Sequence, residues 1–190
     1  MAARSPAPRR RRPRGSLSPE LILDAAEAVA ARGFDALTMR AVAARLDAVP
    51  MALYNHFATK EQLVDALLDR VLSRFSPAPP SGDWIEDLRA FARAHRQVLA
   101  DHPWAVAEIF KHPNPGPAAV RIGEHAFGIL ARGGLSENDA VAAFSGLLAL
   151  NYGWSSFVVA GAVQAGYGSD EHYEFALDRF LAGIRSGAAG

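Results

Sequence analysis

The amino-acid sequence predicts an all-α protein. Two observations carry this prediction: apolar residues recur every three or four positions along most of the 190 residues, and a helix-capping residue precedes most of these runs. No segment alternates apolar and polar residues as a half-buried strand would. A third observation divides the chain, because the proline-rich stretch at residues 76–82 interrupts the helical pattern.

The first 16 residues are expected to form a disordered basic arm. Six arginines, three prolines and no acidic residue fall within the first 14 positions, a composition that cannot build a packed element. The zero net charge of the whole chain hides this asymmetry, and the arm is expected to face a polyanion. No apolar segment of the kind a secretory signal needs follows the arginines, and the chain has no cysteine. These features favour a cytoplasmic protein.

Four helices are expected in the first domain, which spans residues 17–75. Ser18 can cap the first helix, with a proline at its first position. Thr38 can cap a short second helix, Pro50 opens a short third one, and Thr59 starts a capping box for the fourth. The second and third helices are separated by about four residues, the proportions of a helix-turn-helix that places its second helix in the major groove of DNA.

The second domain, residues 76–190, is expected to be helical throughout. Helices begin near Asp83, Pro103, Ala118 and Ser136. A stretch of 30 residues without a charge, from 140 to 169, is long enough for a membrane span, which needs ~20 apolar residues. Its polar residues, its glycines and its acidic flanks argue against a span. It is either a buried core helix or a helix that packs on its own domain with one face and on a second copy of the chain with the other.

The last helix favours the second alternative, because its apolar residues make a broad stripe. Two such helices per subunit predict a homodimer with a four-helix interface.

Hydrogen-bonding side chains are concentrated at the end of the third helix, in the segment "VPMALYNHF" at residues 49–57. Tyr54 and His56 can donate to phosphate oxygens, and Lys60 adds a cation at the start of the next helix. Each residue also has an ordinary interpretation: Tyr54 and Phe57 as core aromatics, His56 and Lys60 as solvated side chains. Their combination behind two capped helices and a basic arm favours DNA binding.

The segment from 17 to 72 resembles the DNA-binding domain of the TetR (tetracycline-repressor) family of bacterial regulators, above all in "GFDALTMRAVAARL" and "ALYNHFATKEQL". The resemblance implies a dimer built from the last two long helices, an effector pocket in the C-terminal domain and repression relieved by the effector. It also implies roles for single residues. The expected phosphate contacts are Thr38, Tyr54, His56 and Lys60, and the expected contacts to base edges are Arg40, Pro50, Met51 and Ala52.

One position departs from the family pattern. The turn usually reads Leu-Gly-Val and here reads Leu46-Asp47-Ala48. Aspartate tolerates a left-handed conformation better than most residues, so the turn is expected to form at some cost in stability. Its carboxylate is expected to lower DNA affinity if it points at the phosphates.

The effector pocket is expected to be apolar and aromatic with a few polar groups. Its candidate residues are Phe91, His95, Trp104, Phe110, His112, Phe127, Asn151 and Trp154, each of which could equally be an ordinary core residue. No catalytic or metal-binding spacing occurs, so neither an enzyme, a metal nor a cofactor is expected. The sequence therefore predicts a dimeric, ligand-responsive repressor of palindromic operator DNA. The alternative is an all-α small-molecule-binding protein or enzyme whose DNA-binding domain has lost its function.

Overall fold

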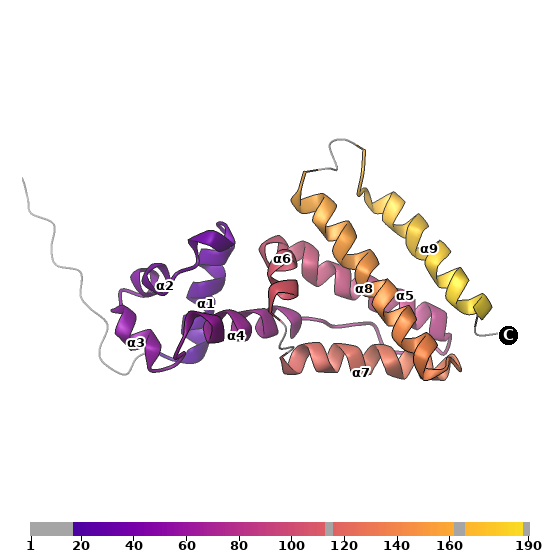
Figure 1. The fold of residues 1–190 in the computed structure, drawn as a ribbon, viewed down its shortest axis with the longest axis horizontal. Coiled ribbons are helices and arrows are strands. Elements are labelled where there is room, and N and C mark those ends of the chain that lie inside the picture. The colour runs from indigo at the N-terminus through magenta and orange to yellow at the C-terminus, as the bar shows by residue number, and fades with distance from the viewer. Residues whose placement is uncertain (1–16, 113–115, 162–165, 188–190) are drawn as a thin grey trace, which may run out of the picture. The chain divides into compact units, whose positions relative to one another are not determined.

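The computed structural model describes residues 17–112, 116–161 and 166–187. The basic arm expected at residues 1–16 lies outside these ranges. Within them the chain forms nine α-helices, one short 3-10 turn and no β-strand (Figure 1). The prediction of an all-α fold is confirmed. The backbone divides into two compact units, with the division between Leu67 and Leu68.

The N-terminal unit contains the four expected helices. They are α1 (Pro19–Ala30), α2 (Met39–Arg45), α3 (Pro50–Tyr54) and the first part of α4 (Lys60–Leu72), with the 3-10 turn η1 (Phe34–Ala36) after α1. The side chains of Ser18 and Thr38 accept hydrogen bonds from the backbone of Leu21 (3.3 Å) and Ala41 (3.0 Å), as their capping role predicts. The core is made of fully buried aliphatic side chains: Ile22, Ala26, Leu37, Val42, Leu53, Leu63 and Leu67.

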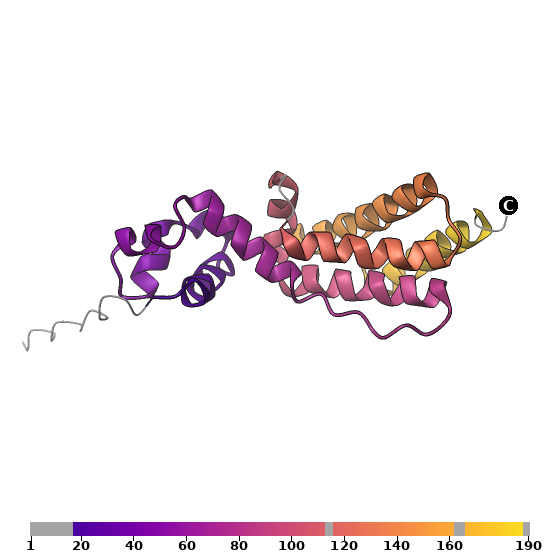
Figure 2. The ribbon, with the colours of Figure 1, turned by 90° about the horizontal axis from the view of Figure 1, so that it is seen from below.

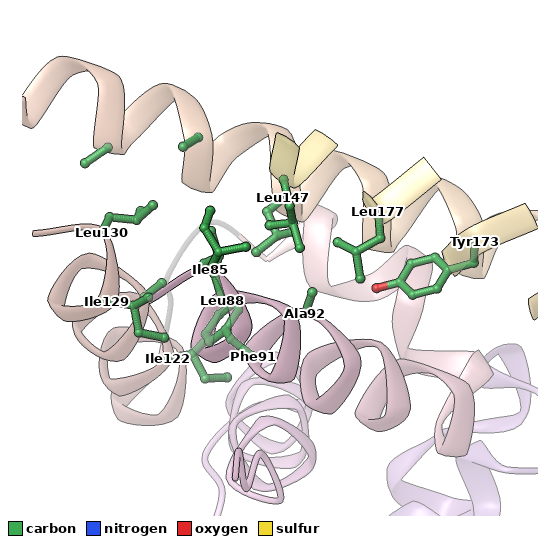
Figure 3. Packing of buried hydrophobic residues seen from close by; sticks show 14 of the residues in the cluster. Ile85, Leu88, Phe91, Ala92, Ile122, Ile129, Leu130, Leu147, Tyr173 and Leu177 are labelled. Carbon is green, nitrogen blue, oxygen red and sulfur yellow. The ribbon is translucent and has the colours of Figure 1, made fainter. Parts of the chain in front are cut away.

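The C-terminal unit is built around α5 (Trp84–Asp101). This helix packs against α6 (Pro103–Lys111), α7 (Pro117–Arg132), α8 (Glu137–Val159) and α9 (Asp170–Gly187). Figure 2 shows α5 and α7 running side by side along the unit. Leu88 and Phe91 on α5, Ile129 on α7, Leu147 on α8 and Leu177 on α9 meet in one buried cluster (Figure 3).

A row of arginine–carboxylate pairs fastens α9 to α5. Arg93 bonds Glu174 at 2.7 Å, Arg96 bonds Asp170 at 2.6 Å, and Arg89 bonds Asp178. A further pair links Arg185 near the end of α9 to Asp83 at the start of α5 (2.9 Å). Most of these carboxylates are exposed, so each pair stabilises the fold only slightly. Together they set the alignment of the two antiparallel helices.

One helix of the described residues, α8, is long and apolar enough to cross a membrane by length and composition alone. Its buried residues Ala140, Ala143, Leu147 and Asn151 recur on one face. Only 28% of its most apolar window is buried, because residues such as Val141 and Phe157 lie on another face and are exposed. One side of α8 therefore packs inside the unit, while no described residue covers its second apolar side.

Candidate functional site

The turn between α2 and α3 has the left-handed conformation that the sequence predicts. Asp47 has φ = 51°, and it is the only non-glycine residue of the described chain with a positive φ. The backbone N–H of Ala48 donates to the carbonyl of Ala43 (2.9 Å), which closes the end of α2. Aspartate thus sustains the turn, as predicted, in a conformation that a side chain disfavours.

Substitution of Asp47 is expected to show the cost of this conformation. Asp47→Gly and Asp47→Ala both remove the carboxylate and its interactions, and they differ only in the β-carbon that strains a left-handed residue. The glycine variant should be more stable than the alanine variant by about 1 kcal/mol in urea unfolding. Equal free energies of unfolding would show that the turn relaxes and stores no strain.

The third helix separates its side chains into an inner and an outer set. Leu53 is fully buried and Phe57 nearly so, and both face the core of the N-terminal unit. Met51 is 69% exposed, Tyr54 is 42% exposed, and His56 lies exposed just after the helix. Of the two aromatics that the sequence left open, Phe57 is a core residue and Tyr54 a surface residue. No described residue bonds the hydroxyl of Tyr54 or the imidazole of His56, so both can bind an external group.

The other candidate DNA contacts lie on the same part of the unit. Thr38 and Arg40 are exposed at the start of α2, and Arg40 forms no ion pair with any described residue. Thr38 accepts the capping hydrogen bond, which leaves its hydroxyl proton available to a phosphate. Lys60 is half-buried at the first position of α4, with its ammonium 5.7 Å from the centroid of the Phe34 ring. Pro50 and Ala52 are half-buried on α3 and offer apolar contact.

A three-helix unit in which a tight turn joins two short helices, and in which the second of them exposes apolar and hydrogen-bonding side chains, is a helix-turn-helix DNA-binding unit. Comparison with known proteins gives the same class. Residues 22–67 match the model of the bacterial regulatory proteins of the tetR family, and residues 76–160 match that of the tetracyclin repressor-like C-terminal domain. The chain belongs to the TetR family.

Three relatives illustrate the match. A transcriptional regulator of Saccharopolyspora erythraea is 35% identical over 147 residues, which cover 77% of this chain and 59% of the relative. A transcriptional repressor of Mycobacterium tuberculosis is 35% identical over 149 residues, covering 74% and 57%. The chain thus spans less than three fifths of the length of these curated relatives. The crystal structure of a TetR variant from Acinetobacter baumannii in complex with minocycline is 26% identical, with a TM-score of 0.79 over 92% of this chain and 100% of that chain.

Three of the candidate effector-site residues come together in the interior of the C-terminal unit. The amide nitrogen of Asn151, which is fully buried, donates to the carbonyl of Ala92 (3.0 Å) and to Nδ1 of His95 (3.1 Å). The hydroxyl of Tyr173 donates to the amide oxygen of Asn151 (2.8 Å). Because Nδ1 of His95 accepts, its proton sits on Nε2. Phe91, the third candidate, stacks on His95 with a centroid distance of 6.2 Å.

Burial lowers the pKa of His95 to about 4. A histidine whose pKa falls on folding binds its proton more readily in the unfolded chain, so stability is expected to fall as the pH drops from about 6.5 towards 4. The slope of unfolding free energy against pH in this window should be reduced in His95→Leu relative to the wild type. Identical slopes would show that His95 is protonated in the folded protein.

The remaining effector-site candidates are dispersed. Trp104 on α6 is half-buried with its ring against His102, and His112 is half-buried after α6. Trp154 on α8 donates from Nε1 to the carbonyl of Ser169 (3.3 Å). Phe127 on α7 is 38% exposed against Phe144. The side chain of Phe110 lies outside the described residues.

Two open cavities in the C-terminal unit have walls of described residues. The larger, of about 740 Å³, lies among the start of α8, the end of α9 and the loop before α8. The smaller, of about 230 Å³, lies among the end of α4, the segment that follows it and α7. Neither of these described walls includes any of the eight candidate residues. Among the described residues no three acidic or histidine side chains cluster as a metal site would.

Several residues of these sites were not singled out from the sequence. Tyr173 was assigned only to an apolar stripe, although its hydroxyl completes the buried network. Arg121 and His125 were passed over, and they line the smaller cavity with Phe75. Their spacing of four on one helix face was the available signal, since such residues are neighbours on an α-helix.

Proposed function

We propose that this chain is a homodimeric transcriptional repressor that binds a palindromic operator and leaves it when a small hydrophobic effector enters the C-terminal unit. The observation that carries the proposal is the exposed set on and beside α3, in which Met51, Tyr54 and His56 have no partner within the described unit. The relatives support a regulator over an enzyme, because they are named as transcriptional regulators and repressors. We place the protein in the cytoplasm, where its DNA target lies.

The dimer is proposed to form through α8 and α9. The uncovered apolar side of α8 supports this arrangement, together with Phe175 on α9, which is 61% exposed. A helix with two apolar faces is stabilised when a second copy covers the outer one. Two copies of α3 would then read half-sites separated by about one turn of the duplex, roughly 34–36 Å.

The effector is proposed to be a small aromatic or otherwise apolar molecule bound near Phe91, His95 and Asn151, with Trp104, Phe110, His112, Phe127 and Trp154 as further candidate contacts. The TetR relative in complex with minocycline supports an effector site in this half of the fold. Small-molecule sites combine apolar walls with few polar groups, as this region does.

DNA-binding residues are proposed to divide into two groups. Thr38, Tyr54, His56 and Lys60 bind phosphates, and Arg40, Pro50, Met51 and Ala52 contact base edges. Arg40 is the strongest candidate for sequence recognition, because its guanidinium matches O6 and N7 of guanine. Apolar residues such as Met51 can contact thymine methyl groups.

Substitutions in the two groups are expected to behave differently. Tyr54→Phe and Lys60→Ala should weaken binding to every operator variant alike, whereas Arg40→Ala should cost about 1–3 kcal/mol and relax the preference at one base pair. Fluorescence anisotropy with the DNA upstream of the chain's own gene, and with single-base variants of it, measures both effects. An Arg40→Ala variant that lost the same affinity on all variants would contradict the base-contacting role.

A salt series tests the function itself. Binding through phosphates should weaken steeply as the salt concentration rises, and Lys60→Ala should reduce the slope by about one counterion. Arg93→Gln is a suitable control, because Arg93 pairs with Glu174 inside the C-terminal unit and should leave the slope unchanged. Absence of measurable specific binding would favour a small-molecule-binding protein without DNA function.

A further inference from the structure

The smaller cavity of the C-terminal unit combines an aromatic wall with a cation that has no partner among the described residues. Phe75, which is half-buried, contacts His125 edge-to-face at a centroid distance of 5.9 Å. Both rings also pack against Phe91, at 5.0 Å and 6.1 Å. The wall is therefore held by a fully buried side chain of the core, and its flat faces suit a planar aromatic group.

Arg121 stands at the rim of this cavity, one helical turn before His125. Its guanidinium forms no ion pair or hydrogen bond with a described residue. Most other arginines of α5, α7 and α9 bond a carboxylate, including Arg93 with Glu174 and Arg132 with Asp87. Arg121 thus keeps its planar pair of donors available for an external acceptor.

Two acidic side chains lie close to the cavity. Asp69 accepts a hydrogen bond from the backbone N–H of Ala118 (2.7 Å), so its charge is spent on the N-terminus of α7. Glu124 is exposed and is not bonded to Arg121. Ser73 donates its hydroxyl proton to the carbonyl of Arg70 (2.7 Å) and therefore offers only a lone pair to the cavity. The donor that faces a ligand is the guanidinium.

We propose that this cavity binds a small aromatic carboxylate, with the guanidinium of Arg121 on the carboxylate and the rings of Phe75 and His125 against the aromatic group. The assignment rests on the proposed effector response and gives the chemical class of the effector. At the packing density of protein interiors, a space of about 230 Å³ holds roughly a dozen non-hydrogen atoms, the size of a one- or two-ring acid.

Two probes of the same shape separate charge recognition from simple apolar binding. Isothermal titration calorimetry on the full chain compares 1-naphthoate with 1-naphthamide, in which a neutral amide replaces the carboxylate. The wild type should bind the acid about tenfold more tightly or better, as expected for a paired charge that is partly shielded from water. Arg121→Gln should remove this preference, and His125→Ala should weaken both probes alike. Arg179→Gln, an arginine over the ring of Phe175 on α9, should change neither affinity.

Equal affinity for acid and amide, failure to bind either, or the same loss in Arg179→Gln would overturn the site. A separate measurement distinguishes this failure from that of the proposed function: operator affinity is determined with and without 1-naphthoate. Binding of the acid without any change in operator affinity would support the site and contradict the effector response. Operator binding that is intact in a chain that binds neither probe would support the repressor and reject the site.

Discussion

Replacing Asn151 with leucine is expected to lower the free energy of unfolding by about 2–5 kcal/mol, measured by urea at a fixed protein concentration. The leucine has a similar volume, so the loss comes from polar groups and not from a cavity. The hydroxyl of Tyr173, the carbonyl of Ala92 and Nδ1 of His95 would each lose a partner in the dry interior. A buried polar group without a hydrogen bond costs far more than the bond itself contributes.

Asn138 provides the matched control. It lies in the first turn of the same helix and is exposed, so Asn138→Leu makes the same chemical change where water can solvate every group left behind. Its effect should stay within about 0.5 kcal/mol. Similar losses in both variants would show that leucine disturbs α8 itself and that the buried network adds little stability.

Phe91→Ala is expected to cost about 3–5 kcal/mol, since it removes a fully buried ring from the centre of the C-terminal core. The ring lies between the imidazoles of His95 and His125, with interplanar angles of 5° and 13°, and it meets Phe75 and Phe144 edge-on. Helices α5, α7 and α8 all contribute to this cluster, so its neighbours cannot close the gap by moving a single side chain.

Phe127→Ala makes the same truncation at a ring that is 38% exposed and contacts Phe144 at 5.2 Å. Its cost should be well below that of Phe91→Ala, because the truncation leaves a space that water can fill. Phe91→Leu should fall between the two, since it keeps part of the buried volume. The order would be reversed if the aromatic cluster were loosely packed and the exposed ring supported it.

Helix starts were the part of this fold that the sequence predicted best. Ser18, Thr38, Asp83 and Ser136 each accept a hydrogen bond from the first turn of the helix they were expected to cap. Capping is a local interaction between residues two or three apart, so it can be predicted from neighbouring residues. The left-handed turn at Asp47 was predictable for the same reason.

Side-chain partners between distant segments could not be predicted in this way. The hydrogen bond between Tyr173 and Asn151 joins residues 22 positions apart, and that between Asn151 and His95 spans 56 positions. Nothing in a helical pattern tells which buried polar residues will face one another, because this depends on how whole helices pack. Exposure was similarly undetermined for Tyr54 and Phe57, which are three residues apart yet differ in burial, with one ring on the surface of the unit and the other in its core.

The row of charges between α5 and α9 makes the C-terminal helix sensitive to changes in length. Its rungs on α9 are Asp170, Glu174 and Asp178, each one helical turn from the next. Deleting one residue between them turns the rest of the helix by about 100° and shortens it by about 1.5 Å, which pulls the later rungs away from their arginines. A residue added before position 169 would leave the spacing intact. Tolerance to insertions should therefore change abruptly at the start of α9.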